Sequence, residues 1–127
     1  MKISEEQLRA VVALPAEVRY EHFIKRVADT EEVWILDEDG WAMASNADGT
    51  QILPVWSAFE YADMCRRGEW ENYRPASIEL EELLNGVLPD LAENGILIAV
   101  SYLPKDEGVV VDSNRLSLDI ERELQNY

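Results

Sequence analysis

The residues able to do nucleophilic or metal chemistry are few in this chain of 127 residues. It has one cysteine, Cys65, and one histidine, His22. A structural zinc site takes about four Cys or His ligands, and these two lie on different predicted helices, so we expect no zinc site. A histidine-activated nucleophile would have to use His22, and the chain has no Gly-x-Ser-x-Gly turn to present a serine. We therefore interpret His22 as a solvated residue on a helix face.

Two interpretations of Cys65 are open. Arg66 and Arg67 follow it directly, and nearby cations can lower the pKa of a thiol and make it reactive. Its helical register with Ala58 and Ala62 instead places it on the inner face of a helix. We favour the buried thiol, and its accessibility to a labelling reagent distinguishes the two interpretations.

The glycines and the paired aspartates indicate turns rather than ligand sites. No two glycines are closer than nine residues, so neither a P-loop nor a dinucleotide-binding loop can form. Asp37, Asp39 and Asp48 lack the spacing and the terminal glutamate of an EF-hand. We expect no cofactor and no metal.

One short segment combines arginines with aromatic residues. Residues 66–74 contain three arginines and two acids, whereas residues 33–65 carry six acids, residues 75–104 carry five, and neither stretch has a Lys or Arg. Trp, Tyr and Arg are the residues that most often dominate binding energy at interfaces. Trp70 and Tyr73 are expected to be exposed, whereas Arg66 and Arg67 could instead complement the dipole of a helix C-terminus. The candidate partner-binding residues are Arg66, Arg67, Trp70, Tyr73 and Arg74.

The overall charge limits the classes of partner. The chain has 11 Lys and Arg against 26 Asp and Glu, a formal charge of −15, and 47% of its residues are apolar. Phosphate backbones and anionic lipids repel such a protein, so we expect no binding to nucleic acid or to a membrane surface. A single cysteine excludes an internal disulfide, and residues 1–6 are too polar for a signal peptide. We expect a cytoplasmic protein.

The first half of the chain predicts two helices followed by strands. Ser4 to Gln7 has the spacing of a capping box and begins a short helix. Pro15 opens a second helix with a buried stripe at helical spacing, formed by Tyr20, Phe23, Ile24 and Val27. Extended patterns at residues 33–36, 41–44 and 51–56 then predict a three-stranded β-meander with turns at Gly40 and Gly49.

The second half completes a single α+β domain over residues 1–127. Ser57 and Glu60 predict a capped helix through Arg67. Residues 75–80 fit a strand or a helix entry, and a Leu-rich helix follows, in two pieces broken near Gly86 and Pro89. Residues 96–100 are apolar on both faces and predict the central strand, with a further strand at 109–111 and a closing helix that buries Leu116, Ile120 and Leu124. The expected sheet is mixed, mostly antiparallel, has about four to six strands, and packs against the helices.

Several segments together resemble a known bacterial family. Arg19–Phe23, Glu32–Leu36 and Leu53–Trp56, with Tyr61 and Ala62 beyond, are similar to the domain-of-unknown-function family 2750 (DUF2750). Further matches extend the resemblance over nearly the whole chain, namely Trp70, Pro75, Ile78, Leu80, the Leu-rich helix and the strand after Gly95. The order of elements is also similar, at the level of the fold, to the N-terminal domain of SseB-type proteins. Neither family supplies a catalytic motif, so the resemblance implies a fold and leaves the function open.

Three functional hypotheses follow from these features. The first is a non-enzymatic protein-binding or regulatory module with an unidentified protein partner, because an ordered core is predicted without a catalytic grouping. The alternative is an immunity-type neutraliser of a basic, nuclease-like toxin, since an acidic surface speeds association with a basic protein. A carboxylate-based enzyme ranks third, because 26 acids make some chance pair inevitable. An open edge strand would also allow a homodimer.

Overall fold

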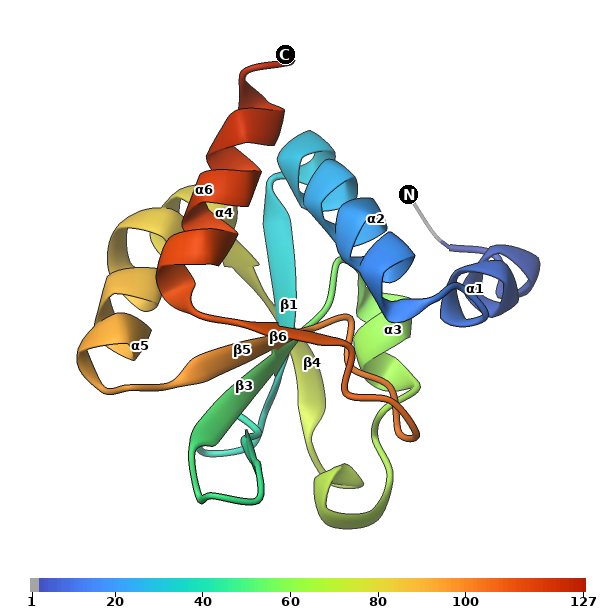
Figure 1. The fold of residues 1–127 in the computed structure, drawn as a ribbon. Helices are drawn as coiled ribbons and strands as arrows, with labels where there is room; N and C mark the ends of the chain where they lie inside the picture. Colours follow the sequence, from blue (N-terminus) through green and yellow to red (C-terminus); the bar gives the residue numbers. More distant parts are fainter. Residues whose placement is uncertain (1–2) are drawn as a thin grey trace.

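The chain begins with the two helices that its sequence predicts. In the computed structural model, which describes residues 3–127, α1 spans Glu5–Val12 and α2 spans Ala16–Thr30 (Figure 1). The Ser4 hydroxyl accepts a hydrogen bond of 3.1 Å from the backbone N–H of Gln7 and so caps α1. Pro15 stands at the N-cap of α2. The predicted stripe of α2 is buried, namely Tyr20, Phe23, Ile24 and Val27.

The strands form two sheets. A two-stranded antiparallel sheet pairs β1 with β4, and a four-stranded sheet has the order β2-β3-β5-β6. In the larger sheet, β3 and β5 run parallel and the other neighbours antiparallel. The predicted α+β class with a mixed, mostly antiparallel strand arrangement is confirmed. The strands are β1 (Glu32–Asp37), β2 (Ala44–Ser45), β3 (Gln51–Val55), β4 (Arg74–Glu79), β5 (Leu97–Val100) and β6 (Val109–Val111).

The prediction of a three-stranded meander is wrong at its first turn. β1 meets the segment that follows it through one isolated bridge, between Asp37 and Trp41. Along its whole length β1 pairs instead with β4, which supplies a partner for each of its six residues. The two sheets meet where the backbones of Trp34 and Trp56 exchange hydrogen bonds of 2.8 and 2.9 Å. One edge of β1 therefore pairs with β4, and its other edge bonds to Ala42 and Trp56 without forming a continuous hairpin ladder.

The helix after β3 is shorter than predicted. α3 spans Phe59–Asp63, its N-cap is Ala58, and it has no side-chain capping bond. Ser57 is buried, and its carbonyl accepts a hydrogen bond of 3.3 Å from Nε of Arg26. The predicted Ser57 cap is therefore wrong, because this buried residue lies in the bend between the end of β3 at Val55 and the N-cap Ala58. A 3-10 turn, η1 (Gly68–Trp70), follows, and Gly68 has a left-handed φ of 57°.

The Leu-rich region is one continuous helix that contains a π turn. α4 (Leu80–Glu82), the π turn η2 (Leu83–Val87) and α5 (Leu88–Glu93) follow one another without interruption. Pro89 lacks an N–H, and in a regular α-helix its ring would clash with the carbonyl of Asn85, so the wider turn relieves the conflict. The predicted break is therefore a local widening. Gly95, whose φ is 68°, follows the C-cap Asn94 of α5.

The core has two apolar clusters. The larger cluster lies between the sheets and α2, α4, η2, α5 and α6 (Ser113–Leu124), and it contains the predicted central strand β5 (Figure 1). The smaller cluster lies under α1 and α3 around Trp56, which is fully buried. In α6 the predicted residues Leu116 and Ile120 are fully buried, and Leu124 packs against the larger cluster.

Two leucines of α6 provide a matched test of this core. Leu116 is 0% exposed and Leu118 is 47% exposed. We expect Leu116→Ala to lower the free energy of unfolding by about 2–5 kcal/mol, because it removes buried methyl groups and leaves a cavity. Leu118→Ala should change it by no more than about 0.5 kcal/mol. Urea unfolding followed by tryptophan fluorescence measures both, and equal losses would contradict the position of α6.

Candidate functional site: a basic cleft beside Trp70

The predicted arginine and aromatic segment folds back on itself as a loop. The guanidinium of Arg66 donates to the carbonyl of Tyr73 at 2.6 Å, to the carbonyl of Glu71 at 3.4 Å and to the carboxylate of Asp63 at 3.0 Å. These bonds close the loop and use much of the donor capacity of Arg66 inside the protein. Arg67 and Arg74 are exposed.

The two aromatic residues expected to be exposed are half-buried. Trp70 and Tyr73 pack against the smaller core cluster, and the ring of Trp70 lies 5.2 Å from the ring of Tyr102, tilted by 54°. Their large rings cover the edge of that cluster, so the exposure prediction is wrong. Exposed aromatic side chains occur instead at Trp41 (38% exposed) and Phe59 (44%).

Two adjoining hollows open beside this loop, and both are lined by Arg67 and Pro104. The first has a volume of about 320 Å³ and is walled by Cys65, Trp70 and Tyr102, with Gly68 and Glu69 at its edge. The second, of about 400 Å³, has mainly apolar walls and three cationic side chains. We call the two hollows together the basic cleft. The residues of the second hollow are Val12, Leu14, Arg19, Met64, Arg67, Leu103, Pro104, Lys105 and Asp106.

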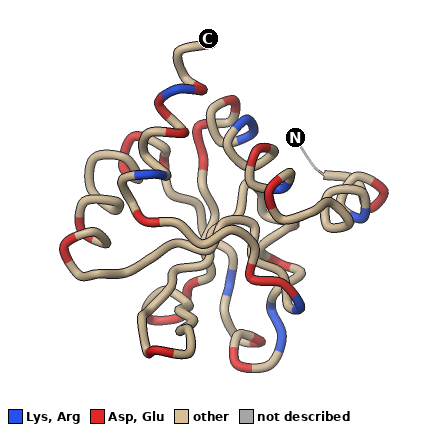
Figure 2. The backbone as a smooth tube through the Cα atoms, viewed as in Figure 1, with Lys and Arg blue, Asp and Glu red and all other residues tan. Residues whose placement is uncertain are grey.

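The balance of charge distinguishes the second hollow, because three of the 11 Lys and Arg side chains line it with one carboxylate. A larger hollow beside α2 and α6, of about 730 Å³, is also lined by three cationic side chains, but four carboxylates accompany them. Figure 2 shows acidic positions on most helices and turns. Basic positions lie on α1, α2, α6 and β4, and also on the loop after α3 and the loop between β5 and β6. In the second hollow, Arg19, Arg67 and Lys105 face one carboxylate, Asp106. The cleft is therefore a locally cationic site on an acidic protein.

Chain segments that leave the two parallel strands build the cleft. Because β3 and β5 are parallel, their carboxyl ends lie at the same edge of the sheet (Figure 1). The chain beyond β3 continues through α3 to Arg67, and the chain beyond β5 supplies Tyr102 and the residues after it. The indole N–H of Trp56 donates to the carbonyl of Tyr102 at 2.7 Å, which fixes the two segments relative to each other.

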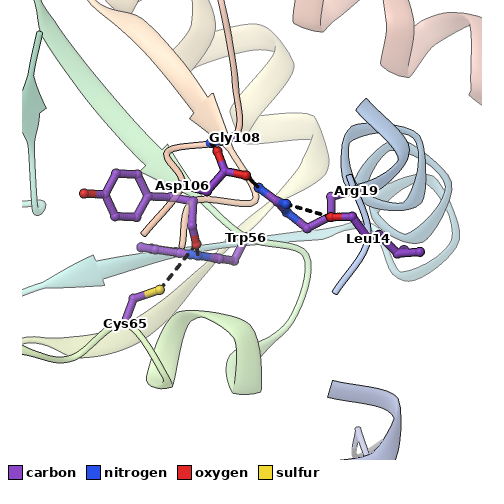
Figure 3. Close-up of polar contacts among 7 residues, drawn as sticks. Leu14, Arg19, Trp56, Cys65, Asp106 and Gly108 are labelled. Atoms are coloured by element: carbon purple, nitrogen blue, oxygen red, sulfur yellow. Dashed lines mark hydrogen bonds and ion pairs between the residues drawn. The ribbon is translucent and has the colours of Figure 1, made fainter. Parts of the chain in front are cut away.

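Arg19, from the first turns of α2, is the buried cation of the cleft. Its side chain is 2% exposed. Among the described residues two hydrogen bonds hold it, from Nη1 to the carbonyl of Leu14 at 2.9 Å and from Nη2 to Asp106 Oδ2 at 3.1 Å (Figure 3). Nε is buried and has no hydrogen-bond partner within residues 3–127. Nη1 and Nη2 each have one partner, so Nε is the one nitrogen of this buried guanidinium without a partner among these residues.

Asp106 is held in place from two sides. Its Oδ1 accepts a hydrogen bond of 3.0 Å from the backbone N–H of Gly108, and its Oδ2 accepts the bond from Arg19 (Figure 3). These contacts, the Gly108 bond first, hold the pKa of Asp106 below its usual value. The carboxylate is therefore ionised at neutral pH and is the counter-ion of Arg19.

Cys65 lines the base of the first hollow, and its thiol is in an environment that disfavours reaction. It is buried, and its Sγ lies 3.3 Å from the carbonyl oxygen of Tyr102 (Figure 3). Burial raises the pKa of the thiol to about 12, although the nearby indole N–H of Trp56 and the charge of Arg67 act in the opposite direction. The predicted buried thiol is confirmed.

His22 lies on α2 and is half-buried rather than fully solvated. Its ring meets the ring of Tyr61 edge-on at 6.1 Å. Burial, and secondly the charge of Arg26, lower its pKa, so the imidazole is neutral at pH 7.

Two further findings concern the described part of the chain as a whole. Within residues 3–127, no three His, Cys, Asp or Glu side chains gather as ligands for a metal ion. Over the same residues, no helix combines the length and the apolar character needed to cross a membrane.

Sequence reasoning missed Arg19, Tyr102 and Lys105 as site residues. For Arg19 a signal exists, because it precedes the buried residues Phe23 and Val27 by four and eight positions and so shares their helix face. Tyr102 and Lys105 carry no such signal, since they lie in an irregular loop whose place is set by the parallel pairing of β3 and β5.

Thiol labelling tests the floor of the cleft. We expect Cys65 in the native protein to react with an aromatic disulfide reagent at least about 100-fold more slowly than in the urea-unfolded chain, because the thiol is buried and protonated. Rapid stoichiometric labelling of the native protein would show an accessible thiolate and contradict this environment.

Gly108 tests the close approach of the β5–β6 loop. A Cβ at this position would lie 2.4 Å from the carbonyl oxygen of Val100, and the backbone φ is +81°. Gly49 has a similar φ of +88°, but a Cβ added there would have nothing within 4 Å, so Gly49→Ala measures the backbone strain alone. We expect Gly49→Ala to cost about 1 kcal/mol and Gly108→Ala about 2 kcal/mol or more in urea unfolding. Equal costs would show that the loop does not approach β5 closely.

Comparison with known proteins adds a family to this description. The model of a family described as "Protein of unknown function (DUF2750)" matches residues 20–120. The match includes all six strands and the cleft residues Arg67, Trp70, Tyr102 and Asp106, and it begins one residue after Arg19. A comparison with curated proteins found no match. The chain belongs to the DUF2750 family, as its sequence resemblance implied.

Proposed function

We propose that the protein is a non-enzymatic binding module of the cytoplasm that recognises a partner protein through the basic cleft. One observation carries this proposal: in a protein of charge −15, three cationic side chains line one hollow, and Trp70 and Tyr102 line the hollow beside it. Aromatic and arginine side chains at a partly desolvated site are the usual anchors of protein interfaces. The partner segment should carry negative charge and apolar surface.

The groups of the cleft favour binding over catalysis. Arg67 and Lys105 can hold an anion, Trp70 can cover an apolar group, and the thiol of Cys65 is protonated with a pKa of about 12. A nucleophile needs an adjacent base or a lowered pKa, and this thiol has the opposite environment. The carboxylate of Asp106 is occupied by Arg19 and Gly108.

A second candidate function is the neutralisation of a basic, nuclease-like toxin. A separate hollow of about 530 Å³ favours it, because the exposed Trp41 stands there with Glu82 and Asp90. An acidic surface with an aromatic anchor is suited to a cationic partner, and association should then slow as ionic strength rises. Salt-insensitive association with a toxin encoded beside this gene would exclude steering by the acidic surface.

Affinity capture from native lysate tests the cleft as the contact surface. We expect Arg67→Ala with Trp70→Ala to lose proteins that the parent chain retains, because both substitutions remove lining side chains of the cleft. Trp41→Ala with Arg122→Ala is the matched control, because it makes the same two replacements outside the cleft. Circular dichroism establishes that each variant is folded. Identical sets of captured proteins from the parent and the cleft variant would contradict the proposal, and a loss confined to the control would favour the second candidate.

A further inference from the structure

The pairing of Arg19 is incomplete for a buried charge. Removing a guanidinium from water costs several kcal/mol unless partners replace its hydration. Arg19 has one carbonyl and one carboxylate as partners, and that carboxylate, on Asp106, is itself 49% exposed. A buried polar atom without a partner, such as Nε here, calls for an explanation.

The walls around Arg19 indicate what would complete its pairing. Arg67 and Lys105 line the same hollow and are both exposed, so they can reach a ligand at its mouth. The N-terminus of α2, a helix of 15 residues, follows Leu14 and adds positive potential on the same side. The remaining lining is apolar, namely Val12, Leu14, Met64, Leu103 and Pro104.

We propose that the second hollow of the basic cleft binds a carboxylate that carries an apolar group. The carboxylate lies among Arg19, Arg67 and Lys105, and the apolar group contacts Leu14, Met64 and Leu103. A planar carboxylate matches the fork of guanidinium donors, which accounts for arginine at two of the three cationic positions. A hollow of about 400 Å³ has the size of a site for one residue or a small acid.

A monoanion suits this hollow better than a polyanion. Its lining includes the carboxylate of Asp106, so each additional negative charge on a ligand placed there meets further repulsion. A nucleic acid or a nucleotide would also leave the five apolar lining residues without a partner. A single carboxylate with an apolar substituent can contact both the cationic and the apolar residues that line the hollow.

Such a carboxylate can come from a chain terminus or from a free acid. Resting on the proposed function, we assign it to the C-terminal carboxylate of the partner protein, whose last side chain is apolar. Capture of a terminal carboxylate is a known mode of peptide recognition. A free carboxylic acid has the same chemistry, and the experiment separates the two sources.

Calorimetric titration of the full chain with three probes tests the assignment. The probes are an N-acetylated hexapeptide without charged side chains that ends in leucine with a free carboxylate, the same peptide with a C-terminal amide, and octanoate. We expect the peptide acid to bind at least about tenfold more tightly than the amide, because only the acid offers a charged acceptor. Octanoate should bind more weakly than the peptide acid, since it lacks the backbone groups of a chain end.

Variants of the hollow locate the binding. Arg67→Gln and Lys105→Gln should each weaken binding of the peptide acid by about threefold to tenfold. Arg122→Gln changes the net charge equally at an exposed position outside the hollow and should leave binding unchanged. Asp106→Asn should strengthen binding by about threefold to tenfold, because it removes the carboxylate that competes for Arg19. A purely structural role for Asp106 would instead leave the affinity unchanged or lower it.

The outcomes separate this inference from the proposed function. Binding of octanoate without binding of the peptide acid would support the carboxylate site and overturn its assignment to a partner protein. Equal binding of acid and amide, or no binding of any probe by a folded chain, would overturn the carboxylate site. A partner captured through Trp70 and Arg67 would in that case still support the proposed function.

Discussion

One buried positive charge organises the end of the molecule where β3 and β5 finish. Arg19 bonds to Leu14 in the turn between α1 and α2 and to Asp106 in the β5–β6 loop, so it connects two loops that no strand pairing joins (Figure 3). The loop can approach because Gly108 has no side chain between Arg19 and Val100. The arrangement satisfies the charge only in part, and this incomplete pairing gives the basic cleft its capacity to hold an anion.

The acidic character of the rest of the surface contributes to the choice of ligand, because it discriminates against long polyanions. Exposed charges farther apart than about 10 Å are largely screened at physiological salt, so a small anion inside the cleft experiences mainly Arg19, Arg67 and Lys105. A long polyanion would extend over acidic helices and turns and would be repelled there (Figure 2). The formal charge of −15 and a cationic cleft are therefore compatible.

Local patterns in the sequence predicted the elements better than they predicted the pairing of strands. The Ser4 cap was accessible from the spacing of its capping box, and the buried stripe of α2 and the central strand β5 from periodicity. Cys65 is buried as predicted, but in the turn after α3, which ends at Asp63, rather than on a helix face. The pairing of β1 with β4 could not be predicted in this way. The segments β2, β3 and α3 separate the two strands in the chain, and no local pattern in the sequence indicates that β1 pairs with β4 rather than with the segment next to it. For the site, the segment 66–74 indicated the right region. The cation from α2 and the loop after β5 join it only through tertiary structure.

The most direct measurement of the central claim is the side-chain Nε–H resonance of Arg19 in ¹⁵N-labelled protein. As the leucine-terminated peptide acid is added, the account predicts that this resonance shifts to saturation together with that of Arg67, while the Nε–H of Arg122 stays in place. The amide form of the peptide should cause no such shift. Saturable binding that leaves the Arg19 resonance unmoved would show that the buried guanidinium takes no part, and would contradict the account.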